Sequence, residues 1–114
     1  MAKKVEKNAI DARIEELKEI YKDLPTEKMA LAMPLIENAA FIENEMRKLQ
    51  EIIKNDGAVD EYQNGANQFG KKQSANLQSY NALVKSYNMI NTRLEAMLPP
   101  RKKEQTKLGD LMNE

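Results

Sequence analysis

The segment EYQNGANQFGKKQ, residues 61–73, interrupts a chain that otherwise has the pattern of long helices. Its Asn64-Gly65 pair favours a type I′ turn in a two-residue loop, because both residues accept positive φ. The flanking residues predict a short β-hairpin over residues 59–69, with strands from Val59 to Gln63 and from Ala66 to Phe69. Because an isolated hairpin is only marginally stable in water, we expect it to pack on the helices or to pair with a neighbouring subunit.

Two helices are predicted before this segment. The first covers residues 5–23, where apolar residues recur every three or four positions, namely Ile10, Ile14, Leu17, Tyr21 and Leu24. Pro25 ends it, because the residue before a proline avoids the α region. Two charge pairs three residues apart, Glu15 with Lys18 and Glu19 with Lys22, are expected on its outer surface.

The second predicted helix covers residues 26–54, with Thr26 as its N-cap and Gly57 in the left-handed position after its end. Pro34 lies inside the apolar pattern. It removes a backbone donor and clashes with the preceding turn, so a kink or a break is expected there. Either residues 26–33 form a separate short helix, or one bent helix runs to about Lys54.

A long third helix is predicted over residues 74–98, with Ser74 as its N-cap and Pro99-Pro100 as its stop. Its apolar stripe is wide, and its other face carries amides and hydroxyls instead of charges. The helix is either a core helix with a tolerant surface or a self-association face. In the second reading, Asn91 lies on a core-type position and fixes the register. The residues predicted to form an oligomer interface are Leu77, Tyr80, Asn81, Val84, Tyr87, Asn88, Asn91 and Leu94.

Together these patterns predict a mainly α fold. A helical hairpin, with its second helix kinked near Pro34, is followed by a short β-hairpin and a long C-terminal helix. We expect one helical domain over residues 1–98 and a flexible tail over residues 99–114. The tail is either a disordered terminus or a segment that docks in a partner's groove through one small apolar cluster, formed by Leu108, Leu111 and Met112.

The composition argues against catalysis. The chain has no Cys and no His, which removes disulfides, thiolate metal sites and the commonest general base at neutral pH. The carboxylates lie on predicted exposed helix faces, so we expect no enzyme, no metal site and no cofactor. No apolar run approaches the ~20 residues that span a membrane, and the N-terminus does not resemble a signal peptide. A cytoplasmic protein without membrane contact is expected.

Basic residues form three short clusters, although the formal net charge is zero. Clusters of two or three are common on soluble proteins, but on one surface they contact phosphates. Repetition of such a patch around a ring would strengthen that contact. The candidate nucleic-acid-binding residues are Lys3, Lys4, Lys7, Lys71, Lys72, Arg101, Lys102 and Lys103.

The order of elements resembles the terminase small subunits of tailed phages, especially those of Gram-positive hosts. The resemblance covers about Asp56 to Pro99, with the sequence DGAVDEYQNGANQFGKKQSANLQSYNALVKSYNMINTRLEAMLP. It includes a strand with Val59, the Asn64-Gly65 turn and the basic Lys71-Lys72 pair. After these come the helix that starts at Ser74-Ala75, with Tyr80, Leu83 and Tyr87, and the terminal Leu98-Pro99.

The resemblance implies a non-catalytic role in packaging viral DNA inside the bacterial host cell. Terminase small subunits assemble into rings, recognise viral double-stranded DNA and regulate the large terminase subunit, which carries the ATPase and the nuclease. The alternative is a small helical interaction module, such as a phage regulator or an antitoxin, that binds no nucleic acid.

Overall fold

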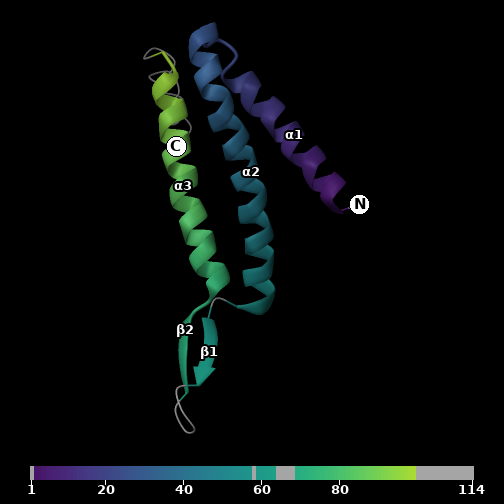
Figure 1. The fold of residues 1–114 in the computed structure, drawn as a ribbon, viewed down its shortest axis with the longest axis vertical. Helices are drawn as coiled ribbons and strands as arrows, with labels where there is room; N and C mark the ends of the chain where they lie inside the picture. The colour runs from purple at the N-terminus through teal and green to yellow at the C-terminus, as the bar shows by residue number, and fades with distance from the viewer. Residues whose placement is uncertain (1, 58, 64–68, 100–114) are drawn as a thin grey trace, which may run out of the picture.

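The computed structural model describes residues 2–57, 59–63 and 69–99, and within them the fold is mainly helical, as predicted. Helix α1 (Ala2–Ile20) leads into the long α2 (Thr26–Asp56). Strands β1 (Val59–Gln63) and β2 (Phe69–Gln73) follow, and α3 (Ala75–Met97) comes last. Figure 1 shows α2 between α1 and α3, with the two strands beyond the end of the α2–α3 pair.

Helix α1 forms about where its apolar stripe predicts, but it begins and ends three residues earlier than expected. A tight turn replaces its last predicted residues, in which the Leu24 amide donates to the Tyr21 carbonyl at 3.1 Å. Both predicted charge pairs on its surface are present. Lys18 Nζ lies 3.4 Å from Glu15, and Lys22 Nζ lies 2.8 Å from Glu19.

Helix α2 runs through Pro34 without a break, so the alternative of a separate helix over residues 26–33 is wrong. Pro34 cannot donate to the carbonyl of Ala30, four residues earlier. Both residues are exposed, so that side of the helix faces water, which can satisfy the missing hydrogen bond.

The ends of α2 differ in detail from the prediction. Pro25 is the N-cap and Thr26 is the first helical residue, with no capping hydrogen bond from a side chain. The prediction that Thr26 caps the helix is therefore wrong. Gly57 has the expected positive φ of 87°, but its ψ of 169° lies outside the left-handed helical region. Its amide still donates to the Ile53 carbonyl at 2.7 Å.

The strands β1 and β2 pair antiparallel, with Val59 opposite Gln73 and Gln63 opposite Phe69. A two-residue Asn64-Gly65 loop predicts Gln63 opposite Ala66, so the observed register differs from the predicted one. The predicted strand residues 66–68 lie outside the described residues. In the observed register Asp60 lies opposite Lys72, and Glu61 lies opposite Lys71. The Asn64-Gly65 pair itself lies outside the described residues.

Helix α3 starts as predicted. The Ser74 hydroxyl oxygen accepts a 3.0 Å hydrogen bond from the Leu77 amide, which satisfies one of the free donors of the first turn. Ser74 is only 2% exposed, so the cap is shielded from competing water.

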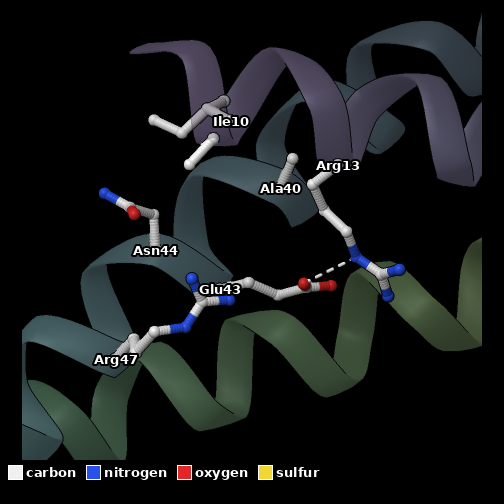
Figure 2. Close-up of a pocket in the computed structure, with 7 residues that line it drawn as sticks. Ile10, Arg13, Ala40, Glu43, Asn44 and Arg47 are labelled. Atoms are coloured by element: carbon white, nitrogen blue, oxygen red, sulfur yellow. Dashed lines mark hydrogen bonds and ion pairs between the residues drawn. The ribbon is translucent and has the colours of Figure 1, made fainter. Parts of the chain in front are cut away.

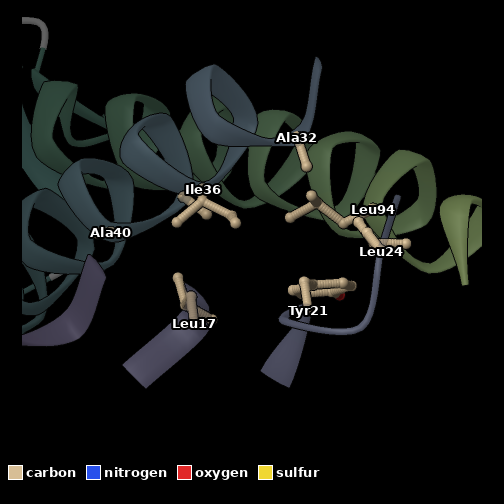
Figure 3. Close-up of a cluster of buried hydrophobic side chains, with 8 residues drawn as sticks. Leu17, Tyr21, Leu24, Ala32, Ile36, Ala40 and Leu94 are labelled. Carbon is tan, nitrogen blue, oxygen red and sulfur yellow. The ribbon is translucent and has the colours of Figure 1, made fainter. Parts of the chain in front are cut away.

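The hydrophobic core lies where all three helices meet (Figure 3). Alanines on α2 let the neighbouring helices approach closely, while larger side chains of α1, of the turn that follows it and of α3 fill the space between them. Its buried members are Leu17, Tyr21, Leu24, Ala32, Ile36, Ala39, Ala40 and Leu94.

Away from this core the molecule is narrow and open. Outside the cluster, Ser74 is the only fully buried residue within the part of the chain whose burial is described. The radius of gyration is 19.1 Å, whereas a compact chain of this length has about 13 Å. The α2–α3 pair therefore keeps apolar side chains half exposed along much of its length.

Candidate functional site

Glu43 joins the three helices through its two carboxylate oxygens. The Arg13 guanidinium of α1 donates from Nε to Glu43 Oε1 at 2.8 Å (Figure 2). The Tyr87 hydroxyl of α3 donates to Glu43 Oε2 at 2.7 Å. The Glu43 side chain is only 14% exposed, so these bonds are partly shielded from water. This network was not predicted, because no periodic pattern marks a half-buried carboxylate.

The pKa values of the two groups that donate to Glu43 are both raised. The pKa of Arg13 is raised above its ordinary value, mainly by its hydrogen bond to Glu43 and next by its hydrogen bond to Glu16. Burial, followed by the hydrogen bond to Glu43, raises the pKa of Tyr87. At neutral pH Arg13 is therefore charged and Tyr87 is neutral, and both donate to the carboxylate.

A small cavity beside this network is lined by Ile10 and Arg13 of α1 and by Ala40, Asn44 and Arg47 of α2 (Figure 2). Its volume of about 10 Å³ suits at most about one water molecule. Asn44 Nδ2 is buried without a hydrogen-bond partner and would donate to such a water. The cavity is too small for a substrate or a cofactor.

The described carboxylates form no recognisable reactive centre. Among the described residues there is no group of three acidic side chains placed to hold a metal ion. Several are paired with a basic side chain, as Glu6 and Glu45 are with Lys48. In the same part of the chain, no helix is long and apolar enough to cross a membrane.

The basic candidates do not gather on one described surface. Lys3, Lys4 and Lys7 are exposed at the free end of α1. Lys71 and Lys72 belong to β2, beyond the end of the α2–α3 pair, so the two groups lie apart (Figure 1). The third cluster, Arg101 to Lys103, lies outside the described residues. Contact with DNA stays a prediction for all three clusters.

The register of the strands bears on whether Lys71 and Lys72 are well placed to contact phosphates. These lysines stand opposite Glu61 and Asp60 on β1, so the formal charges of the four positions cancel. Glu6, the acidic residue next to Lys7 in the sequence, pairs with Lys48 at 3.3 Å. The free end of α1 is therefore the better placed of the two described clusters for phosphate contact.

The residues predicted to form the oligomer interface divide between two sides of α3. Leu94 is 1% exposed within the chain's own core. Tyr87 and Tyr80 bond to α2, Tyr80 by accepting from Gln50 Nε2 at 2.9 Å. Leu77, Val84 and Asn91 are half-buried, whereas Asn81 and Asn88 are exposed. Much of the predicted stripe thus packs against α2 of the same chain.

The outer face of α3 nevertheless differs from an ordinary solvated surface. Lys85, Arg93 and Glu95 are the only charged residues of the helix, whereas over half of the α1 residues are charged. Met89 on this helix is 58% exposed. The predicted partner cluster of the tail, Leu108, Leu111 and Met112, lies outside the described residues.

Comparisons of the chain with known protein families, with curated proteins and with solved structures find no match.

Proposed function

We propose that the chain is a non-catalytic subunit of a phage DNA-packaging machine, of the terminase small-subunit type. It self-associates, contacts duplex DNA through phosphates and regulates a large terminase subunit in the cytoplasm of the bacterial host. A ring is the assembly that the family resemblance implies.

The arrangement of β1, β2 and α3 is the observation that carries this proposal. Strand β2 ends at Gln73, and the Ser74 cap starts α3 immediately. This is the order on which the resemblance to the terminase small subunits rests. The elongated shape adds support, because a chain with half-exposed apolar side chains along α2 and α3 suits a subunit of a larger assembly.

Two measurements on the purified full chain test the proposal. Light scattering coupled to size exclusion gives the mass in solution, and a gel shift with duplex DNA at low and high salt gives the binding. We expect an oligomer that retards DNA, with binding that weakens as salt rises because phosphate contacts release counterions. An oligomer that retards no DNA even at low salt contradicts the packaging role.

A helical interaction module without nucleic-acid binding is the second candidate. The observation that favours it is the charge balance: the net charge is zero, and Lys71 and Lys72 stand opposite acidic residues. A module of this kind would leave DNA unshifted while retaining a protein partner.

A further inference from the structure

The outer side of α3 carries a stripe of polar residues whose side chains can all donate hydrogen bonds. They follow each other at alternating spacings of three and four residues, which places them on one side of a helix, and every one of them is exposed. Their side chains end in an amide, a hydroxyl or an ammonium group. The residues of this polar stripe are Gln78, Asn81, Lys85, Asn88 and Thr92.

The polar stripe faces away from the rest of the molecule. Tyr87, which bonds to Glu43 of α2, and Leu94, which lies in the core, mark the inner side of α3. Lys85 precedes Tyr87 by two residues, about 200° round the helix. Figure 1 shows α3 at one edge of the molecule, with α2 between it and α1. A partner can therefore reach the stripe without displacing a described helix.

The surface around the stripe is basic and lacks counter-ions. The sequence of α3 has no acidic residue before Glu95, which comes after the end of the stripe. Lys85 in the stripe and Arg93 on its flank make no ion pair within the described part of the chain. Ser79 and Ser86 precede Arg93 at seven-residue intervals, and all three are exposed. A polyanion with many hydrogen-bonding groups complements such a face.

The two asparagine side chains in the stripe are available to a partner. The Gln78 amide donates to the Gln73 carbonyl at 3.3 Å, and the Thr92 hydroxyl donates to the Asn88 carbonyl at 2.8 Å. The side chains of Asn81 and Asn88 make no hydrogen bond to the described residues. A carboxamide offers an acceptor and two donors, which match the N6 and N7 groups of adenine.

The dimensions of the stripe suit the major groove of duplex DNA. That groove is about 12 Å wide and admits an α-helix. Asn81 and Asn88 are seven residues apart, which is about 10.5 Å along the helix axis. Three base-pair steps of about 3.4 Å have nearly the same length. The two amides can therefore reach bases a few steps apart in one groove.

We propose that the polar stripe lies in the major groove of duplex DNA, where Asn81 and Asn88 bind the edges of adenines. Lys85 and Arg93 contact the phosphates beside the groove. The proposal rests on the DNA contact in the proposed function and deepens it, because it adds base recognition by α3 to phosphate contacts. Self-association then uses surfaces other than Asn81 and Asn88.

The charge at the centre of the stripe argues against a second copy of the chain as the partner. Lys85 is the middle residue of the stripe. A two-fold axis through that centre would therefore bring the Lys85 side chains of the two copies together. Like charges that face each other across an interface are unfavourable, whereas the phosphates of DNA neutralise both cations of this face.

Anisotropy measurements with two labelled duplexes of equal length, one of alternating A·T pairs and one of alternating G·C pairs, test base recognition by the full chain. Wild type should bind the A·T duplex about fivefold more tightly or better, since one bidentate base contact contributes about that factor. Asn81→Ala/Asn88→Ala should lose this preference and keep its helical circular dichroism, because alanine favours a helix more than asparagine does. Asn38→Ala/Asn55→Ala changes two exposed asparagines of α2 and, as the matched control, should keep the preference.

A salt titration tests the phosphate contact. Arg93→Gln should lower the slope of log affinity against log salt by about 0.9 for each chain that contacts the duplex, and should leave the preference for A·T pairs in place. Lys28→Gln removes an exposed cation at the start of α2 and, as the control, should leave the slope unchanged. An unchanged slope for Arg93→Gln overturns the placement of α3 in the groove.

The outcomes separate this proposal from the proposed function. A wild type that binds neither duplex at low salt overturns both. A wild type that binds the two duplexes equally, or a preference that survives in Asn81→Ala/Asn88→Ala, overturns base recognition by α3 and leaves phosphate binding standing. A lower mass of Asn81→Ala/Asn88→Ala by light scattering assigns the stripe to contact between copies and likewise overturns the proposal.

Discussion

Tyr87 on α3 donates a 2.7 Å hydrogen bond to Glu43 on α2, although 44 positions separate the two residues in the chain. The same carboxylate accepts from Arg13 on α1. One half-buried acid thus fixes the register of α3 on α2 and the position of α1 beside them.

Tyr87→Phe should destabilise the fold by about 1–2 kcal/mol, because it removes a hydrogen bond to a charged acceptor while keeping the ring in place. The free energy of unfolding from urea denaturation measures the effect. Tyr80→Phe is the matched control, since Tyr80 accepts from an exposed amide and should change stability by a smaller amount. Equal costs for the two variants would contradict the importance of the Glu43 network.

Stability should decline at alkaline pH. Burial raises the pKa of Tyr21 and of Tyr87 above the ordinary value of 10.0, so the folded state favours the neutral phenols. This contribution is fully present below the unfolded pKa and is lost as pH rises through the folded pKa. Urea midpoints measured from about pH 8 upward should fall above about pH 10. The fall should be shallower for Tyr87→Phe, and identical slopes would show that this group is not involved.

Ser74→Ala should cost about 1 kcal/mol of stability, because the hydroxyl caps α3 through its bond from the Leu77 amide. Thr26→Ala is the control, since Thr26 makes no capping hydrogen bond with its side chain. Thermal or urea unfolding should show a loss for the first variant and almost none for the second. The reverse order would mean that the caps are assigned to the wrong residues.

These two positions show what the sequence can and cannot predict. Ser74 and Thr26 look alike as N-caps in a linear pattern, but only Ser74 bonds to its helix. At the other site Pro25 already occupies the N-cap position. The apolar spacing predicted all three helices, because periodicity depends on local geometry.

The apolar pattern of α3 could not decide whether the predicted interface residues pack on the same chain or on a partner. A stripe such as Tyr80, Tyr87 and Leu94 has the same spacing whether it packs on its own chain or on a partner. Its intramolecular contacts depend on the offset between α2 and α3, which Glu43 and Gln50 help to set. The strand register shows the same limit, because Gln63 lies opposite Phe69 and not opposite the residue that a two-residue loop predicts.

Gly57→Ala should destabilise the chain by about 1 kcal/mol. Gly57 has φ of 87°, a conformation that residues with a Cβ avoid. Space is not the cause, because a Cβ there would meet no atom within 4 Å. Asn55→Ala, two residues earlier in the exposed last turn of α2, is the control and should have little effect on the urea midpoint. A neutral Gly57→Ala would mean that the chain adjusts its path after α2 without cost.

DNA binding should depend more on the free end of α1 than on the strands. Lys3, Lys4 and Lys7 are exposed on α1, whereas Lys71 and Lys72 stand opposite acidic positions. Each phosphate neutralised on duplex DNA contributes about 0.9 to the slope of log affinity against log salt. The variant Lys3→Ala/Lys4→Ala/Lys7→Ala should therefore bind more weakly and with a shallower slope than wild type. Lys71→Ala/Lys72→Ala should change the slope less.

Self-association should amplify this difference. One chain with two or three phosphate contacts binds poorly at physiological salt, but several linked copies raise the effective concentration of the remaining contacts once the first engages. Salt titrations on variants of confirmed wild-type mass separate the two effects. A larger loss from the β2 lysines than from the α1 lysines would place the DNA contact on the strands. Unchanged binding in both variants would remove both described clusters from the DNA interface.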